Sequence, residues 1–514
     1  GPSWYWMPDV FERFFADFNK KPSDYYELIK LSPAYRVYFG INDFIAIADN
    51  LDEIVTTFEN IEKGSGKVLR AFMAEAQSNY DIAIKDLVYR PGVSPLELVT
   101  TKTAQKVGQF FSNISRDVRK KFTNPRLIQI LEFPVLFLGA KPSDTPSFYS
   151  FMNYADFGLG TWHPKTGMFD VVLAMESLAR ELGVKFVTNA AIEKIIVENK
   201  TAKAVVINGQ TITSDVVLSG ADYHHTETLL DKEHRAYSGA YWESRVFAPS
   251  SLLFYVGFDK KIENISHHAL FFDVDFYQHA KDIYDEPQWP KEPLFYANFP
   301  SLTDPTAAPE GMESAFFLVP LAPGINDSEA LREQYFDKII TRFEQLTQQT
   351  VKNNIIFKQS FCKNDFVSEY NSYKGNAYGM ANTLLQTAFL RPKLKSKKVN
   401  NLYFTGQLTV PGPGVPPALI SGKLVSELIN KMNINEAELI LLKHWDKIKK
   451  SPSFIQTSLY IASDKLIKLV AETINSSSSP DTFFIHISSH YGMMTKNHKG
   501  ITNIKQLEVL IPYL

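Results

Sequence analysis

The sequence predicts an α+β (mixed α/β) protein whose sheets are assembled from segments far apart in the chain. Residues 51–157 follow a mostly helical pattern, whereas residues 184–219 and 245–375 are rich in short strands. A strand, a Gly/Pro loop and a helix follow over residues 402–431. The chain has 514 residues, which exceeds one simple core, so two or three interleaved domains are expected.

The N-terminal elements are a helix and a set of short strands. Pro8 suits the first turn of a helix, and apolar residues recur at helical spacing over residues 10–18. Residues 25–31, 35–39 and 44–48 alternate or are β-rich, which predicts an antiparallel meander. The long helical region behind them is expected to form a helical subdomain.

A basic amphipathic helix is predicted from Thr101 to Phe122. Lysine and arginine side chains are interspersed there with apolar ones such as Val107, Phe110 and Ile114. This pattern is typical of a helix that lies in a lipid headgroup layer. The alternative is a solvated helix that packs its apolar face on a core.

Two helices interrupt the strand-rich regions. The first covers residues 167–182 and ends at Gly183, and the second covers residues 328–347. Strands are expected at residues 184–187, 191–197, 202–207, 211–213, 216–219, 251–258, 269–272, 294–298, 314–319 and 402–405.

Composition excludes several classes of protein. The net charge of -2 provides no field that would gather nucleic acid, so no nucleic-acid partner is expected. The one cysteine, Cys362, forms no internal disulfide and no cysteine-based metal cluster, which favours the cytoplasm. The apolar runs fall short of the roughly 18 to 20 residues of a membrane-spanning helix. We therefore expect a cytoplasmic protein that is soluble or lies on a membrane surface.

The segment most informative about chemistry starts at the strand over residues 402–405. Gly406 and Gln407 follow it, and a Pro/Gly loop at residues 411–417 leads into an apolar helix. Missing side chains let backbone N–H groups approach a ligand, and the helix dipole favours an anion or an electron-rich oxygen. A phosphate or the edge of a flavin ring would fit. A rigid turn between strand and helix is the alternative.

The order of these segments resembles the flavoprotein amine oxidases and their carotenoid-desaturase relatives. Four separated motifs are similar to the bacterial phytoene desaturase family: residues 1–9, 132–139, 149–156 and 406–422. The resemblance covers about residues 1–431. It implies a flavin amine oxidase-like two-domain fold, FAD as cofactor and a long polyene substrate.

The resemblance also implies a division into domains. Residues 1–160 would form mainly a helical, membrane-facing substrate domain, and residues 241–375 would add the antiparallel sheet and helix of that domain. Residues 161–240 and 376–431 would belong to the FAD-binding domain. Residues 432–514 would be an appended tail outside the family match.

The cofactor contacts implied by the resemblance lie in three places. The backbone near Ile192 would hold the adenine side, and the strand ending before Ala221 would approach the core of the cofactor domain. The final loop would meet the flavin and its ribityl chain through Gly406, Gln407, Gly412, Gly414 and Val415.

One departure from the family concerns the phosphate site. Family members carry a strand, a G-x-G-x-x-G turn and a helix upstream of the segment that resembles residues 1–3. The sequence contains no such fingerprint. We therefore expect an incomplete FAD-binding domain with an unpaired sheet edge, and weak or absent binding of FAD by this chain.

Desaturation removes two hydrogens from adjacent carbons of a hydrocarbon. A flavin can take a hydride at N5, while the protein supplies orientation, a dry apolar tunnel and a proton acceptor. Aromatic side chains crowd the helical subdomain, and Phe137, Tyr149 and Tyr154 are predicted substrate contacts. The alternative is that these aromatics only form the core.

Three residues are candidates for the proton acceptor: Asp156, Glu132 and His163. A carboxylate in apolar surroundings has a raised pKa and can then serve in acid/base work. The alternatives are that Asp156 stabilises a turn and that His163 is a hydrogen-bonded structural group. The adjacent pairs at residues 224–225 and 267–268 would point apart on a strand, so no metal site is expected.

The leading hypothesis is an FAD-dependent desaturase that converts phytoene to a lycopene-type polyene. A carotenoid isomerase, saturase or ketolase of the same fold is one alternative, and an inactive apolar-lipid binder without a working cofactor site is another. A substrate that partitions into lipid implies contact with a membrane surface.

Overall fold

A seven-stranded mixed sheet forms the largest part of the fold. The computed structural model describes residues 3–98, 100–430, 484–485 and 507–508. In the sheet, all neighbouring strands are antiparallel except β10 and β2, which are parallel. The strand order is β13 (Ile355–Phe361), β9 (Ser250–Phe258), β12 (Glu313–Leu321), β11 (Phe295–Asn298), β10 (His268–Phe271), β2 (Tyr35–Gly40) and β3 (Asp43–Ile47).

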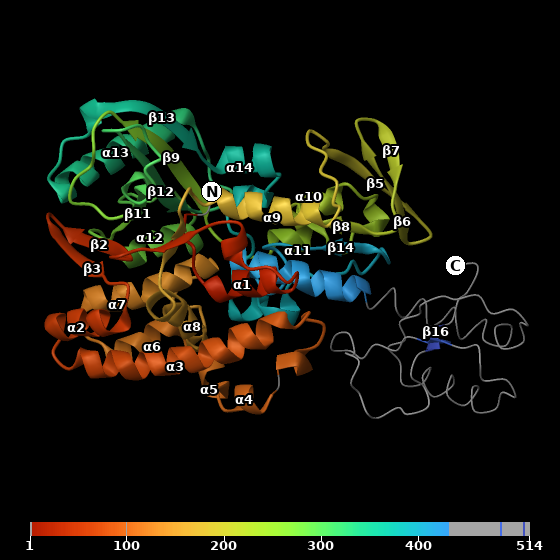
Figure 1. Ribbon diagram of the computed structural model, residues 1–514, viewed down its shortest axis with the longest axis horizontal. Helices are drawn as coiled ribbons and strands as arrows, with labels where there is room; N and C mark the ends of the chain where they lie inside the picture. The colour runs from red at the N-terminus through yellow and green to blue at the C-terminus, as the bar shows by residue number, and fades with distance from the viewer. Residues whose placement is uncertain (1–2, 99, 431–483, 486–506, 509–514) are drawn as a thin grey trace, which may run out of the picture. The chain divides into compact units, whose positions relative to one another are not determined.

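This sheet joins segments that lie more than two hundred positions apart in the sequence. Ala269 pairs with Arg36, so the N-terminal hairpin completes a sheet built from residues 250–361. Helix α13 (Glu329–Thr347) covers one face (Figure 1). The core between helix and sheet is aromatic, with Phe254, Phe317 and Phe343 fully buried.

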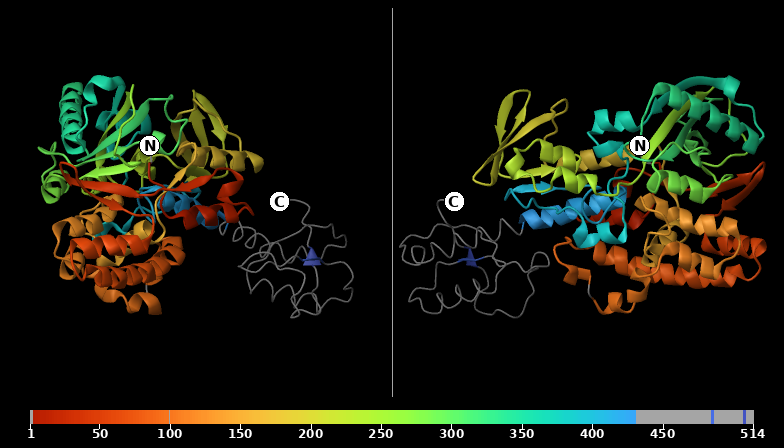
Figure 2. Two further views of the ribbon diagram at one scale, coloured as in Figure 1. Left: turned by 60° about the vertical axis from the view of Figure 1, so that its left-hand side comes forward. Right: turned by 180° about the vertical axis from the view of Figure 1, so that it is seen from behind.

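Helices fill the region on the other side of the sheet. The chain passes there through α2 (Leu51–Ile61), α3 (Ser65–Lys85), α4 (Thr101–Ala104), α5 (Val107–Phe110), α6 (Ile114–Lys121), α7 (Pro125–Glu132) and α8 (Phe151–Asn153). The views from two further directions show these helices as one layer (Figure 2). Most of residues 51–157 is thus helical, as predicted.

The predicted single basic helix from Thr101 to Phe122 is wrong, because the segment is divided among α4, α5 and α6. Asn113 begins α6 as its N-cap, and its side chain accepts a hydrogen bond from the N–H of Arg116. Asparagine competes for backbone donors in this way and so favours a new helix start over a continuous helix.

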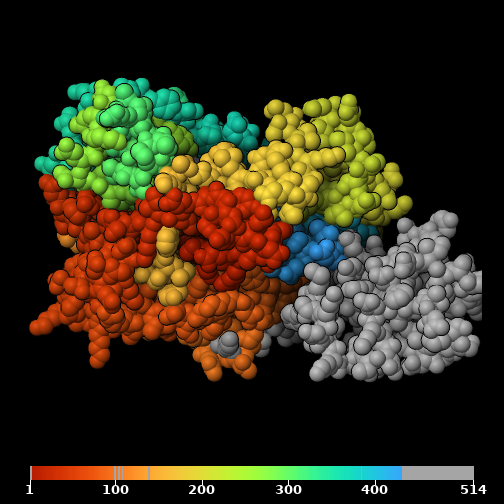
Figure 3. Space-filling view, viewed as in Figure 1, coloured from red at the N-terminus to blue at the C-terminus, as the bar shows by residue number. Residues whose placement is uncertain are grey.

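The N-terminal segment lies between the sheet and the helical layer, as the red surface in Figure 3 shows. It contains α1 (Pro8–Ala16) and β1 (Leu28–Lys30). The predicted meander is correct only for β2 and β3, because β1 pairs with β4 (Trp162–Pro164) instead. Helix α1 packs on α9 (Phe169–Glu181) through Phe11, Phe15 and Leu178.

Two smaller sheets complete this unit. Strands β5 (Ile192–Glu198), β6 (Thr201–Ile207) and β7 (Gln210–Thr213) form an antiparallel sheet, while β8 (Val217–Ser219) and β14 (Leu402–Phe404) form a parallel pair. The strand predicted at residues 184–187 is absent, although the segment is described. Val187 is 77% exposed. Among the described residues, no strand pairs with the backbone of this segment.

The chain divides into two compact units, Gly1–Leu424 and Val425–Leu514. In the second unit, β15 (Phe484–Ile485) pairs antiparallel with β16 (Leu507–Glu508). The predicted tail at residues 432–514 otherwise lies outside the described residues.

Candidate functional site

The carboxyl ends of β8 and β14 lie side by side. The parallel register places Ser219 opposite Phe404, and the N–H of Thr405 donates to the carbonyl of Ser219 at 2.9 Å. Gly220 and Gly406 follow these two strands directly. In α/β structures, ligands bind in the crevice beyond the carboxyl ends of parallel strands. The structure therefore brings together the two segments that the sequence analysis selected at residues 215–222 and 402–417.

Glycine is required at two points of the loop that follows β14. Gly406 has φ +99°, and a Cβ there would meet nothing within 4 Å. Gly412 has φ +143°, and a Cβ there would lie 2.8 Å from the side-chain amide nitrogen of Asn382. The loop thus leaves open space at Gly406 and allows a close approach at Gly412.

The start of the following helix fixes the beginning of the loop. The hydroxyl of Ser421 accepts from the N–H of Gly406 at 2.8 Å and lies 2.6 Å from the hydroxyl oxygen of Thr405. The carbonyl of Gly414 accepts from the N–H of Ala418 at 3.0 Å, within the first helical turn. The N-terminus of this helix, which is the positive end of its dipole, thus follows the glycine loop directly in the chain.

A buried arginine that the sequence analysis missed holds the middle of the loop. Arg391 is 1% exposed, and its guanidinium donates to the carbonyls of Thr409 and Gln407, both at 2.8 Å. It also donates to the side-chain oxygen of Asn382 at 2.7 Å. Arg391 precedes Pro392, Lys393 and Lys395, and such a basic stretch carries no sequence signal of burial.

The other predicted cofactor residues lie around the same two strands. Ile192 is half-buried in β5 and packs in a cluster that contains Leu402 and Phe404 of β14. Ala221 is exposed beyond β8. Val415 is half-buried and packs in the cluster of α1 and α9. All three therefore lie beside the β8–β14 pair or the helix that continues from it.

Asp156 is buried in the helical layer. It belongs to a π-helical turn at Tyr154–Gly158, a feature frequent at functional sites. The hydroxyl of Tyr35 donates to Oδ2 at 2.7 Å, whereas Oδ1 is buried and has no hydrogen-bond partner among the described residues. Burial raises the pKa of Asp156 to about 8, against a smaller lowering by the Tyr35 hydrogen bond. The carboxyl group is therefore protonated at neutral pH.

A group of three histidines lies on the sheet side. The ring centroids of His163 and His267 are 4.4 Å apart, and those of His267 and His268 are 4.5 Å apart. The expectation that the last two rings point apart is wrong, because His267 precedes the first residue of β10 and is free of the strand alternation. Among the described residues, no group of histidine, cysteine and acidic side chains could hold a metal ion.

The three imidazoles are buried with few partners. Nδ1 of His268 contacts the hydroxyl of Tyr296 at 2.7 Å, and Nδ1 of His267 contacts the hydroxyl of Thr303 at 2.8 Å. Both ring nitrogens of His163 and Nε2 of the other two have no hydrogen-bond partner among the described residues. Burial lowers the pKa of all three, to about 3 for His267, so the rings are neutral at pH 7.

Glu132 occupies a different environment from Asp156. Its side chain is fully buried, accepts a hydrogen bond from the hydroxyl of Tyr277 at 2.7 Å, and lies 3.3 Å from Nε of Arg119. Because Tyr277 belongs to α12 (Phe276–Tyr284), these contacts link the helical layer to the sheet domain. This arrangement suits a structural ion pair.

The predicted substrate contacts Tyr149 and Tyr154 have different partners. The hydroxyl of Tyr149 lies 2.9 Å from that of Thr387, whereas the ring of Tyr154 packs on Tyr80, with centroids 5.3 Å apart. The side chain of Phe137 lies outside the described residues, although its backbone is part of a 3-10 turn.

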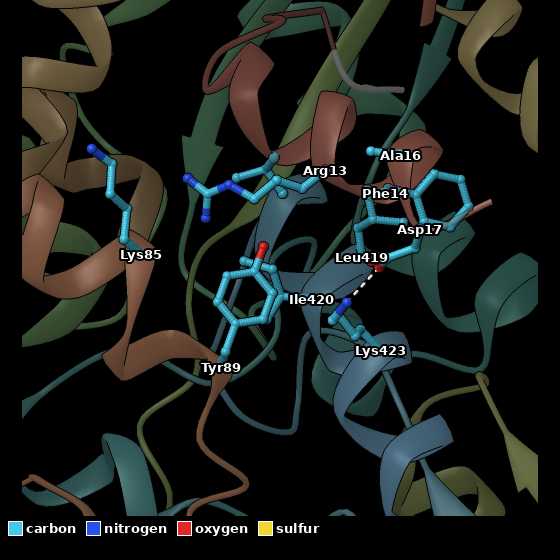
Figure 4. A pocket seen from close by; sticks show the side chains of 10 residues that line it. Arg13, Phe14, Ala16, Asp17, Lys85, Tyr89, Leu419, Ile420 and Lys423 are labelled. Carbon is cyan, nitrogen blue, oxygen red and sulfur yellow. Dashed lines mark hydrogen bonds and ion pairs between the residues drawn. The ribbon is translucent and has the colours of Figure 1, made fainter. Parts of the chain in front are cut away.

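One cavity among the described residues measures about 580 Å³. It lies between α1, the C-terminal end of α3 and the helix that begins at residue 415 (Figure 4). Val10, Phe14, Leu419 and Ile420 give it an apolar wall, and the ion pair between Asp17 and Lys423 lies at its edge. A second cavity of about 350 Å³ is lined by Ser3, Asn298, Phe316 and neighbouring residues of β9 and β12.

Several known proteins are similar in sequence to this chain. Residues 91–430 match the family of flavin containing amine oxidoreductases. The chain is 39% identical over 433 residues to a carotenoid 3,4-desaturase of Haloarcula japonica, covering 84% of this chain and 88% of the relative. The chain belongs to the flavin-containing amine oxidoreductase family.

Further relatives agree with this membership. A zeta-carotene-forming phytoene desaturase of Myxococcus xanthus is 29% identical over 438 residues and is covered to 83%, as is this chain. A redesigned double mutant of putrescine oxidase superposes with a TM-score of 0.50 at 12% identity, over 84% of this chain and 88% of its own. The latter likeness confirms the amine oxidase fold.

Members of the flavin-containing amine oxidoreductase family use a flavin, and the glycine loop fits one. The open space at Gly406 is the feature that a planar ring needs at its edge, whereas Gly412 is a glycine because the side chain of Asn382 packs against it. None of the described helices combines the length and the apolar character that a membrane span requires.

Proposed function

We propose that the protein is an FAD-dependent carotenoid desaturase that introduces double bonds into a long polyene, as in the conversion of phytoene to a lycopene-type product. The observation that carries the proposal is the glycine loop at the carboxyl ends of β8 and β14. It occurs in a chain whose relatives include a carotenoid 3,4-desaturase and a phytoene desaturase. We place the FAD-binding domain in residues 161–240 and 376–431.

The proposed cofactor contacts follow the loop. Gly406, Gln407, Gly412, Gly414 and Val415 would hold the ring and the ribityl chain, and the backbone at Ala221 and Ile192 would hold the remainder. When bound, the flavin supplies a hydride acceptor.

We assign the proton acceptor to Asp156. Loss of a hydride and a proton from adjacent carbons creates the double bond, so a group in the apolar interior must take the proton. Oδ1 of Asp156 is buried and unpartnered, whereas Tyr35 holds Oδ2 in a fixed orientation. His163 is the second candidate, because both of its ring nitrogens are unpartnered. Glu132 is the weakest candidate, since Arg119 and Tyr277 already engage its carboxylate.

The substrate is proposed to lie along aromatic and aliphatic side chains. A long hydrocarbon offers no group for a charged residue, so burial of apolar area provides the binding energy. The 580 Å³ cavity beside the helix that follows the glycine loop has an apolar wall that suits part of such a chain. Tyr154 lies near Lys85, which lines this cavity, and Tyr149 lies near Arg391.

The function is tested by product analysis. Purified protein is supplied with FAD and with phytoene in liposomes, and the extracted pigments are separated by chromatography with absorbance detection. A polyene that absorbs at longer wavelength is expected. An unchanged chromophore with altered geometry would favour an isomerase, a shorter chromophore a saturase, and an oxygenated product a ketolase. Retention of unaltered phytoene would favour an apolar-lipid binder.

We further propose that the protein contacts a membrane through two neighbouring loops. Four large apolar side chains there face solvent: Val93, Phe111, Leu385 and Leu390, which are 66%, 81%, 75% and 41% exposed. The loop with Val93 meets the segment after Leu390, where Nζ of Lys393 donates to the carbonyl of Gly92 at 2.6 Å. Next to Phe111, Phe110 stacks on Phe148, and the hydroxyl of the adjacent Tyr149 lies 2.9 Å from that of Thr387. An exposed apolar patch of this kind is typical of a lipid or protein contact.

Liposome flotation tests this membrane surface. The double variant Phe111→Ser with Leu385→Ser should lose binding to vesicles. Val187→Ser is the matched control, because Val187 is equally exposed but lies in a different segment. Equal flotation of both variants would refute the assignment.

A further inference from the structure

Arg391 differs from Arg332, which is also buried, and from the half-buried Arg342. Arg332 forms ion pairs with Asp327 and Asp365, and Arg342 forms one with Asp273. Arg391 forms no ion pair among the described residues, and its bonds go to four carbonyl oxygens and one amide oxygen. Its positive charge is therefore not neutralised by a nearby carboxylate.

The hydrogen bonds of Arg391 orient the glycine loop. In a trans peptide, the carbonyl and the following N–H point in opposite directions. The carbonyls of Gln407 and Thr409 face the guanidinium, so the N–H groups of Leu408 and Val410 point away from it. Asn382, which accepts from Arg391, also lies against Gly412. A single side chain thus determines which way the loop presents its donors.

The same side chain places a fixed charge beneath the loop. Burial lowers the pKa of Arg391 to about 10, so the guanidinium stays charged at neutral pH. The ionisable groups that influence it are Tyr149 and Tyr241, and burial raises the pKa of both, which keeps them neutral. A buried charge without a counter-ion is costly, and such a charge is typical of a functional site.

We propose that Arg391 is the positioning residue of the flavin loop and that its uncompensated charge favours the negative charge which the flavin gains on reduction. The inference rests on the proposed placement of the flavin at Gly406 and Gly412. Charge near the flavin ring is a general means by which proteins raise its reduction potential. The planar, five-donor fork explains why arginine rather than lysine occupies the position.

Two substitutions separate geometry from charge. Arg391→Lys keeps the charge and loses the fork, whereas Arg391→Gln loses both. We expect both variants to bind FAD at least tenfold more weakly, and amide hydrogen exchange at residues 406–412 to become faster. At saturating FAD, Arg391→Gln should have a lower reduction potential, and Arg391→Lys should stay near the wild-type value. Arg332→Gln, which removes a buried but ion-paired arginine, should lower the melting temperature without changing the potential.

The two measurements test the electrostatic role and the positioning role of Arg391 separately. An unchanged reduction potential in Arg391→Gln would overturn the electrostatic role, and unchanged exchange at residues 406–412 in both variants would overturn the positioning role. If the wild-type protein takes up no flavin even at high FAD concentration, the cofactor assignment itself fails, and with it the electrostatic role. The exchange measurement still decides the positioning role in that case, because it requires no ligand.

Discussion

The indole of Trp4 stacks on the imidazole of His268, with ring centroids 4.0 Å apart and planes inclined by 9°. The same indole meets the ring of Tyr35 edge-on at 5.5 Å, and Tyr35 donates its hydroxyl hydrogen to Asp156. Trp4 therefore separates the carboxyl group on the helical side from the neutral imidazoles on the sheet side. Residues from the start of the chain thus lie between the two groups of titratable side chains that the proposed reaction could use.

The histidine group predicts sensitivity to acid. The pKa of each ring is below its ordinary 6.5, so the unfolded chain binds more protons than the folded chain as the pH falls from 6.5 toward 3. Stability should decrease across this range, by up to about 1.4 kcal/mol per pH unit for each histidine. The double variant His163→Gln with His267→Gln should show a flatter dependence of melting temperature on pH. His234→Gln, outside the group, serves as the control and should retain the wild-type slope.

Asp156 predicts the opposite pH dependence. Its pKa is raised from 3.8 to about 8, so its protonated form stabilises the folded state at low pH, and this contribution is lost as the pH rises through 8. Asp156→Asn should therefore be more stable than the wild type at pH 9 and should unfold with a flatter pH profile between pH 4 and 8. Thermal melts across this range would measure it.

The same group predicts a pH profile of activity. A proton acceptor must be ionised, so desaturation should become faster as the pH approaches 8. Asp156→Asn should lose this rise together with most of the activity, while it still binds the polyene. A variant that keeps the wild-type profile would move the proton acceptor to another residue, with His163 as the next to test.

Glu132 predicts a structural effect. Glu132→Gln keeps an oxygen that can accept from Tyr277 but removes the negative charge that pairs with Arg119, so it should lower stability by about 1 to 3 kcal/mol. Tyr277→Phe should have a smaller effect in the same direction. Both variants should form the same product as the wild type. A specific loss of turnover with normal stability would instead support a catalytic role.

A substitution at Gly406 should weaken FAD binding more than it destabilises the fold. A Cβ at Gly406 meets no protein atom within 4 Å, so Gly406→Ala costs only the backbone strain of about 1 to 2 kcal/mol at a positive φ. If the flavin fills that space, the affinity for FAD should fall at least tenfold. Gly209→Ala is the matched control, because it has a positive φ and open surroundings in a hairpin turn. Equal FAD affinity of the two variants would remove Gly406 from the site.

Local patterns in the sequence identified most of the secondary structure. Helix α9 ends where Gly183 takes φ +85°, and β5 to β9 fall where alternation and turn residues placed them. The glycine loop and its neighbours were also found in the sequence, because a requirement for glycine after a buried strand is a property of adjacent residues. The family motifs predicted a flavin cofactor. Local patterns alone did not decide whether the loop binds a phosphate, binds the edge of a flavin ring or is only a rigid turn.

The remaining features depended on contacts between distant residues. The segment at residues 184–187 has the composition of a strand, yet it forms none, because a strand also needs a neighbour for its backbone. The histidine group became visible only when β4 and β10 were brought together, and Arg391 only when the chain folded around it. The sequence by itself determined the family, most of the elements and the glycine loop. Only the tertiary structure decided which polar side chains are buried without partners, because burial is set by residues far away in the chain.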